Sequence, residues 1–312
     1  MQLAAKILTL AFVGILMAAS VRASSPAMEF GTLPVVQALP LFVASEKGYF
    51  SQEGLAVELV VFNSATDKDV ALTSGRIAGY FGDLMTPMVL HANRVPLKIV
   101  ATVFNTTGSQ RMFALLVPPG SPARHPEELA KGGIATSSNT IVEYITLNLV
   151  GPQNLPGGNL DVIEVKSIPI RLQMLLSGQI PAAALPEPLV TFAETKGARV
   201  VADDAGRGIS FTVLAFGERW LKDHPQGVRA FLKAVSRAAA YINSNPEEAR
   251  PIMNRNCQVP DPLQKSFSIP TFPSPALPDP GHVTDVSRWL VKKGIIRADV
   301  RFEQLVADGF LP

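Results

Sequence analysis

The stretch Leu175–Pro188, with the sequence LLSGQIPAAALPEP, contains a helix end, a turn, a buried strand and a carboxylate between two prolines. Ser177-Gly178 predicts a helix end, because glycine readily adopts the left-handed conformation that follows a last helical turn. The apolar run Pro181–Leu185 is typical of a strand buried on both faces, and Pro186 ends it. Glu187 therefore follows directly on the end of a buried strand.

Two interpretations of Glu187 follow from this position. In open α/β sheets, ligands bind in the crevice outside the carboxyl ends of the strands, which makes Glu187 a candidate ligand-binding residue. Alternatively, Glu187 only occupies the first turn of the next helix, with Pro188 at its first position, where a negative charge is favoured. This stretch alone supports both interpretations equally.

An earlier stretch, Leu72–Asp83 with the sequence LTSGRIAGYFGD, repeats the same construction. A Ser-Gly helix end is again followed by a short buried run and then by an acid. Aligning Gly75 with Gly178 brings the two acids, Asp83 and Glu187, to within one residue of each other. The repeat predicts that the chain builds the same half-site twice.

The length of 312 residues and the hydrophobic content of 47% favour two domains with a sizeable core. Lys6, the apolar run Ile7–Ala19 and the small residues around Ala23 predict a secretory signal peptide at residues 1–23, cleaved after Ala23. A membrane anchor is disfavoured, because a spanning helix needs about 20 apolar residues and this run has 13.

Removal of the signal peptide takes away Lys6 and Arg22 and leaves 26 basic against 26 acidic residues. A neutral chain without a Lys/Arg cluster argues against nucleic acid or an anionic membrane as partner. The single cysteine, Cys257, lies far beyond the signal, so it is no lipid-attachment site and forms no internal disulfide. We expect a soluble, monomeric protein in the periplasm.

Strand–helix units fill the chain up to about residue 103, and a second set follows the turn-rich break Asn105–Gln110. A second break, Asp203–Gly208, precedes the strong strand pattern Ile209–Phe216. We therefore expect residues 24–107 to form the first part of lobe 1 and residues 108–209 to form lobe 2. Residues 210–312 would supply the return strand and C-terminal helices, mostly in lobe 1.

Polar residues open one helix in each expected lobe, at Asn63–Thr66 and at Ser137–Thr140. Free backbone N–H groups at such helix starts can hold a polar ligand group, or the side chains can serve only as helix caps. Pro260–Pro280 contains seven prolines and predicts an extended surface strap, followed by a helix from about Val283.

Motifs of enzymes are absent from the sequence: there is no Walker loop, no His-Glu-x-x-His and no Gly-x-Ser-x-Gly. The four histidines are scattered, and none lies near Cys257 in the sequence. We expect no enzymatic activity, no metal site and no cofactor.

Several runs of the sequence resemble the substrate-binding proteins of ABC importers, in the group that includes receptors for thiamine pyrimidine precursors, alkanesulfonates, taurine and nitrate. These runs are LFVASEKGYF at residues 41–50, GLAV at 54–57, LTSGRI at 72–77, LPEP at 185–188, and His224-Pro225 before FLKA at 231–234. The resemblance covers nearly all of the mature chain. It implies an α/β type II periplasmic binding protein, in which two lobes joined by a two-strand hinge close on a ligand that an inner-membrane ABC permease receives.

The acids Asp83 and Glu187 depart from the neutral donors and aromatics that many anion-binding members supply. A sulfonate or nitrate would be repelled by them unless Arg111 or Arg171 intervened. An aminopyrimidine can donate N–H groups to a carboxylate and stack on walls such as Phe211. A thiamine-precursor aminopyrimidine is therefore the preferred ligand. The alternatives are a sulfonate-, taurine- or nitrate-type anion receptor, a sensor that delivers its ligand to a membrane kinase, and a secreted enzyme on the same fold.

The candidate ligand-binding residues lie at the helix starts, at the strand ends and at the breaks between the expected lobes. They are Asn63, Ser64, Ala65, Asp83, Thr106, Thr107, Ser137, Ser138, Asn139, Thr140, Glu187 and Phe211.

Overall fold

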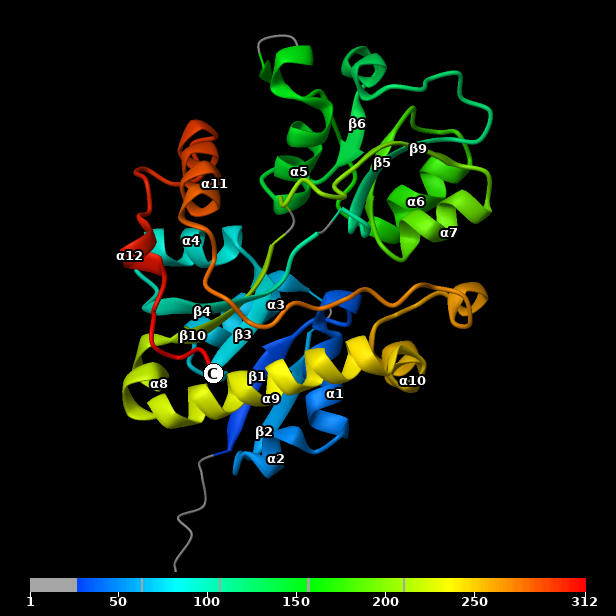
Figure 1. The fold of residues 1–312 in the computed structure, drawn as a ribbon. Coiled ribbons are helices and arrows are strands. Elements are labelled where there is room, and N and C mark those ends of the chain that lie inside the picture. The colour runs from blue at the N-terminus through cyan, green and yellow to red at the C-terminus, as the bar shows by residue number, and fades with distance from the viewer. Residues whose placement is uncertain (1–26, 63, 107, 156–157, 210) are drawn as a thin grey trace, which may run out of the picture.

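The computed structural model describes residues 27–62, 64–106, 108–155, 158–209 and 211–312. Figure 1 shows two α/β lobes, each built around its own sheet of five strands. The expectation of a two-lobed α/β fold is confirmed. The predicted signal peptide, Asn63 and Thr107 lie outside the described residues.

The sheet of the first lobe has the strand order β2-β1-β3-β10-β4. Its strands are β1 (Met28–Thr32), β2 (Val57–Val61), β3 (Gly79–Asp83), β4 (Leu97–Phe104) and β10 (Thr212–Gly217). Strand β1 pairs in parallel with β2 and β3, whereas β10 is antiparallel to both β3 and β4. The carboxyl ends of the parallel strands meet at one edge of the sheet.

The sheet of the second lobe has the order β7-β6-β8-β5-β9, which repeats the same pattern. Its strands are β5 (Phe113–Val117), β6 (Ile134–Thr136), β7 (Val162–Glu164), β8 (Ala183–Pro186) and β9 (Arg199–Asp203). Strand β6 is parallel to β7 and β8, and β5 is antiparallel to β8 and β9. The repeat found in the sequence is thus present in the topology: β3 and β8 are the central strands, and Gly75 and Gly178 before them have φ of 75° and 72°.

The helices of the first lobe cover its sheet and lie at both ends of the chain (Figure 1). They are η1 (Val36–Ala38), α1 (Leu39–Glu46), α2 (Tyr49–Gln52), α3 (Ala65–Thr73), α4 (Met85–Ala92), α8 (Glu218–Asp223), α9 (Pro225–Ser244), α10 (Pro246–Asn256), η5 (Asp261–Leu263), α11 (Pro280–Lys292) and α12 (Phe302–Leu305). In α9, 20 residues long, a stripe of apolar residues at helical spacing is buried. Phe231 of this stripe contacts Phe30 of β1 and Phe50 of α2, with ring centroids 4.5 and 4.9 Å away.

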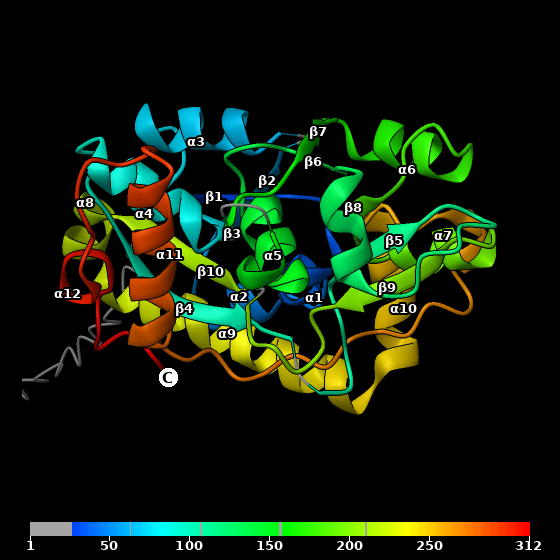
Figure 2. The same cartoon turned by 90° about the horizontal axis from the view of Figure 1, so that it is seen from above.

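The second lobe holds η2 (Pro126–Lys131), α5 (Ile141–Val150), η3 (Pro152–Asn154), α6 (Ile168–Leu176) and α7 (Leu189–Thr195). Figure 2 shows α6 and α7 together at one end of the molecule, away from α3, α4 and α11. Their apolar faces, with Leu175 and Val190 buried, form a separate small core with β5 and β8. Pro188 is the N-cap of α7 rather than its first residue, which follows because β8 continues through Pro186.

The chain passes between the sheets twice, between Phe104 and Phe113 and again between Asp203 and Thr212. The buried carboxylate of Asp204 accepts hydrogen bonds from the backbone N–H groups of Met112 (2.7 Å) and Phe113 (3.0 Å). This carboxylate therefore joins the two crossings side by side.

The proline-rich strap runs across the molecule from α10 to α11 (Figure 1). It is fixed to the first lobe by the bridge of Ala276 with Thr102 and by two hydrogen bonds between the Phe272 backbone and the Asn243 side chain. Helix α11 begins at Pro280, three residues before the predicted start at Val283, because the Asp279 carboxylate caps its first N–H groups.

Candidate ligand-binding site

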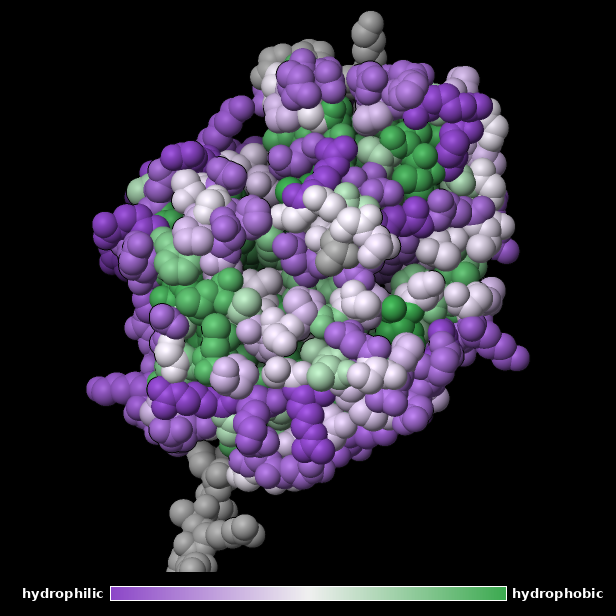
Figure 3. All heavy atoms as spheres, viewed as in Figure 1, coloured by the Kyte–Doolittle hydropathy of each residue, from purple (hydrophilic) through white to green (hydrophobic). Residues whose placement is uncertain are grey.

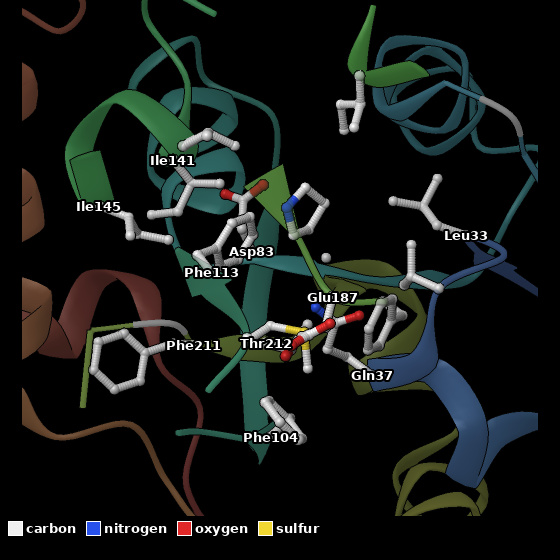
Figure 4. A pocket seen from close by; sticks show the side chains of 17 residues that line it. Leu33, Gln37, Asp83, Phe104, Phe113, Ile141, Ile145, Glu187, Phe211 and Thr212 are labelled. Carbon is white, nitrogen blue, oxygen red and sulfur yellow. The ribbon is translucent and has the colours of Figure 1, made fainter. Parts of the chain in front are cut away.

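A cavity of about 190 Å³ lies between the lobes (Figure 4). It is lined by Leu33, Val35, Gln37, Phe81, Gly82, Asp83, Phe104, Met112, Phe113, Ile141, Val142, Ile145, Ile168, Pro186, Glu187, Phe211 and Thr212. These lining residues are mostly apolar, and they include no Lys, Arg, His or Cys. An apolar cavity of about 150 Å³ holds benzene, so this one is of a size for a single substituted ring. Figure 3 shows hydrophilic residues on the outer ends of both lobes and less polar residues along the middle.

Asp83, at the end of β3, is one of two acids that line the cavity. Its Oδ1 accepts a hydrogen bond from the backbone N–H of Thr86 (2.8 Å), and its Oδ2 accepts one from the Thr86 hydroxyl (3.2 Å). Both bonds fix the carboxylate at the start of α4. Because each carboxylate oxygen has two acceptor sites, the orientation leaves capacity for a ligand.

Glu187, which follows β8, is the second acid and is 8% exposed. Its Oε2 accepts a hydrogen bond from the Thr191 N–H of α7 (3.0 Å), and its Oε1 lies 2.7 Å from Arg111 Nε. The two interpretations of the sequence are therefore compatible in one side chain. Glu187 stabilises the start of a helix and also forms part of the cavity wall.

Arg111 binds Glu187 and also donates to the carboxylate of Glu194. Burial alone would lower the pKa of Arg111, but the hydrogen bonds that it donates to Glu194 and Glu187 raise its pKa above the ordinary value. One guanidinium thus pairs with two carboxylates, so Arg111, Glu187 and Glu194 together carry a net negative charge. Arg111 does not line the cavity.

Arg171, the other arginine considered for an anion, is fully buried in the second lobe. It donates hydrogen bonds to the carbonyls of Val165 and Ala184 and to the hydroxyl of Ser137. Desolvation lowers its pKa to about 10. Arg171 therefore ties the ends of β6, β7 and β8 together, and it does not line the cavity.

The polar run Ser137–Thr140 before α5 is engaged by groups of the second lobe. The Ser138 hydroxyl donates to Glu164 (2.6 Å), and the Thr140 hydroxyl donates to the Ser137 carbonyl (2.7 Å). Asn139, with φ of 61°, donates its backbone N–H to Glu143 (2.6 Å). None of the four lines the cavity, although Ile141 and Ile145 of the helix that they precede do.

The remaining predicted site residues occupy different places. Ser64 caps α3 by accepting a long hydrogen bond (3.4 Å) from the Asp67 N–H, and Ala65 begins that helix. Thr106 is buried in the first crossing. These three do not line the cavity, whereas Phe211 does, with its ring 4.2 Å from that of His282. The cavity therefore brings together Asp83, Glu187 and Phe211 of the predicted set, and their contact with a ligand stays a prediction.

Sequence reasoning missed most of the cavity wall, including Phe104, Phe113 and Gln37. Gln37 is the one polar side chain in the apolar run 33–44, and this isolation was the available signal. It is 9% exposed, and its Oε1 has no hydrogen-bond partner among the described residues. Phe104 and Phe113 carried no comparable signal, because each ends or begins an apolar strand.

A buried ammonium group lies behind the wall at Gly82. Lys68 is 1% exposed, and its Nζ lies 2.7 Å from Asp69 Oδ1 and 3.5 Å from the ring centroid of Tyr80. Desolvation lowers the pKa of Lys68. This lysine partly balances the charge of Asp83 from inside the lobe without reaching the cavity.

The residues of the described ranges offer no candidate metal centre. No three His, Cys, Asp or Glu side chains there form a cluster that would hold a metal ion. Cys257 is buried in the core of the first lobe, and burial raises the pKa of its thiol. None of the helices in the described ranges is long and apolar enough to cross a membrane.

Two α/β lobes, two crossings between them and a ligand-sized cavity at the strand ends define the type II periplasmic binding protein fold. The chain belongs to the family described as "NMT1/THI5 like", whose pattern matches residues 36–249. A search of curated proteins by sequence gave no match.

Solved structures with the same fold include binding proteins and an enzyme. The periplasmic aliphatic sulphonate binding protein SsuA from Escherichia coli has a TM-score of 0.78 at 15% identity, covering 91% of this chain and 93% of that one. The alkanesulfonate-binding protein SsuA from Xanthomonas axonopodis pv. citri, bound to MOPS, has a TM-score of 0.75 at 16% identity, covering 91% and 99%. The desulfurization enzyme DSZB has a TM-score of 0.68 at 16% identity, covering 91% and 97%.

Proposed function

We propose that this protein is an exported solute-binding receptor of an ABC importer, and that its solute is a small ring compound with an amino group, such as a thiamine-precursor aminopyrimidine. The observation that carries the proposal is the lining of the cavity between the lobes. Its walls are apolar, and Asp83 and Glu187 are the charged side chains among the described residues that line it. Apolar walls suit the faces of a ring, and carboxylates suit N–H donors.

The receptor would work by closure. A ligand between the carboxyl ends of β3 and β8 contacts both lobes at once, so its binding favours the arrangement in which the lobes meet. Closure about the crossings near residues 105–110 and 203–211 presents a combined surface of the two lobes to a permease in the inner membrane. The protein would act in the periplasm as a monomer, without a cofactor and without nucleic acid.

An alkanesulfonate is the second candidate ligand. The fold shared with two sulfonate-binding proteins favours it. The charge of the cavity opposes it, because Arg111 is held by two carboxylates and Arg171 by two backbone carbonyls and Ser137. A sulfonate in this cavity would meet two carboxylates without a lining cation.

Titration calorimetry on the exported protein tests the proposal. A 4-aminopyrimidine with methyl and hydroxymethyl substituents, ethanesulfonate, taurine and nitrate serve as probes. Of the four probes, we expect only the aminopyrimidine to show saturable binding. When the same samples are followed by NMR for a day, the aminopyrimidine should remain chemically unchanged. Tighter binding of ethanesulfonate would support the second candidate, and turnover of the aminopyrimidine would support an enzyme.

A further inference from the structure

Gln37 places a carboxamide, with its Oε1 buried and unpaired, in an otherwise apolar part of the cavity wall. It lies in η1, between Val36 and Ala38, which are both fully buried in the core of the first lobe. The side chain is 9% exposed, lines the cavity, and has an Oε1 without a hydrogen-bond partner among the described residues. Figure 4 shows Gln37 and Glu187 extending into the cavity from different elements.

A buried amide oxygen without a partner is unfavourable, and native proteins pair nearly all such atoms. Core packing gives no reason for this carboxamide, because the residues on both sides of it in the chain are apolar and fully buried. A ligand that donates a hydrogen bond to Oε1 would satisfy it. Buried polar groups of this kind reject analogues that lack the matching group far more strongly than apolar walls do.

We propose that Gln37 is a specificity-determining residue, whose Oε1 accepts a hydrogen bond from the ligand amino group. An amino group has two N–H bonds, so it can reach one acceptor in each lobe: Gln37 in the first and Glu187 in the second. The ligand class is then a ring with a primary amino group that bridges the lobes. This inference rests on the proposed function and assigns the amino group its partners.

The test is a thermodynamic cycle with two proteins and two probes. The probes are the 4-aminopyrimidine described above and the same ring with hydrogen in place of the amino group. The variant is Gln37→Met, which keeps an unbranched side chain of similar length and removes the carboxamide; Gln37→Leu is the second choice if it does not fold. Gln173→Leu, at an exposed position of α6 outside the cavity, is the control.

We expect Gln37→Met to weaken binding of the amino probe roughly tenfold to hundredfold and to leave binding of the other probe unchanged. The melting temperature of the unliganded variant should stay equal or increase, because an unpaired amide leaves the apolar wall. A purely structural role of Gln37 predicts a lower melting temperature and equal losses for both probes, and that result would overturn the inference.

The failure of this inference is distinct from failure of the proposed function. If the wild-type protein binds the amino probe and Gln37→Met binds it equally well, only the role of Gln37 is refuted. If the wild-type protein binds neither probe, the proposed function is refuted, and the role of Gln37 falls with it. Calorimetry on the wild-type protein therefore comes first.

Discussion

Glu187 shows how one carboxylate serves the fold and the cavity at the same time. The Thr191 N–H fixes one oxygen, Arg111 fixes the other, and the side chain is still part of the cavity wall. A carboxylate accepts up to about four hydrogen bonds, so the two fixed contacts orient it and leave sites for a ligand. Preorganisation of this kind lowers the cost of binding, because no side chain has to be ordered by the ligand.

Glu187→Gln is expected to weaken binding of the aminopyrimidine roughly tenfold to hundredfold, because an amide replaces a charged acceptor. Calorimetric titration measures this effect. Glu194→Gln is the matched control, since Glu194 is the other partner of Arg111 but does not line the cavity. It should change affinity less than about threefold, well below the loss expected for a charge-assisted bond. An unchanged affinity in Glu187→Gln would remove Glu187 from the site.

Lys68 gives a prediction about pH. Desolvation lowers its pKa below the ordinary 10.5, so between the folded-state pKa and 10.5 the unfolded chain binds more protons. The contribution of Lys68 to stability therefore increases as pH rises through this window. As pH approaches 10.5, we expect the unfolding free energy of the wild-type protein to increase relative to that of Lys68→Met. Denaturant titrations at several pH values measure the difference, and parallel profiles would contradict the assigned burial effect.

At the scale of elements, the sequence predicted the strand–helix junctions well, because their signals are local. Gly75 and Gly178 both adopt positive φ where a helix ends. Each following strand ends at or directly before an acid, whose carboxylate accepts a hydrogen bond from an N–H group of the next helix. The bounds differ by one or two residues: β8 occupies Ala183–Pro186 where the sequence favoured Pro181–Leu185. Pairing with β5 sets these bounds, and its register is not encoded locally.

The composition of the cavity could not be predicted in the same way. Arg111 and Glu187 are 76 residues apart, so their ion pair depends on the fold of the second lobe. The hydroxyls of Ser137–Thr140 looked like ligand donors, but loop residues of this type often bond to their own backbone, as Thr140 does to Ser137. Gln37 was missed because a single polar residue in an apolar run forms no repeating pattern that would indicate a site.

Side chains of α5 in the second lobe contact side chains at and just after α11 in the first lobe. Lys293, just after α11, lies 2.7 Å from Glu143 of α5, and the rings of Tyr144 and Trp289 meet edge to face at 5.5 Å. Lys293→Met removes the ion pair and should favour the open arrangement. Because partly exposed ion pairs contribute at most about 1 kcal/mol, we expect affinity to fall by no more than about fivefold.

Stopped-flow fluorescence measures the association and dissociation rates of the probe. We expect Lys293→Met to increase the dissociation rate and to leave the association rate unchanged. Lys292→Met, at the neighbouring exposed position, is the control. If both variants release the probe at the wild-type rate, the contact between α5 and α11 has no part in closure.

At the scale of the whole molecule, two sheets of the same topology face one ligand-sized cavity. The crossings are held together by Asp204, and the strap is joined to the first crossing by hydrogen bonds between Gln110 and Thr271. These contacts lie beside the crossings, about which we expect the lobes to rotate. Hinge closure absorbs its changes in φ and ψ at a few such loop residues.

Small-angle scattering tests the central claim, that the lobes close on an amino-bearing ring, most directly. The radius of gyration of the exported protein is measured alone, with saturating 4-aminopyrimidine probe and with ethanesulfonate at the same concentration. We predict a decrease with the amino probe alone, together with slower hydrogen exchange at residues 105–110 and 203–211. An unchanged radius with a bound amino probe, or a decrease with ethanesulfonate alone, would contradict the account.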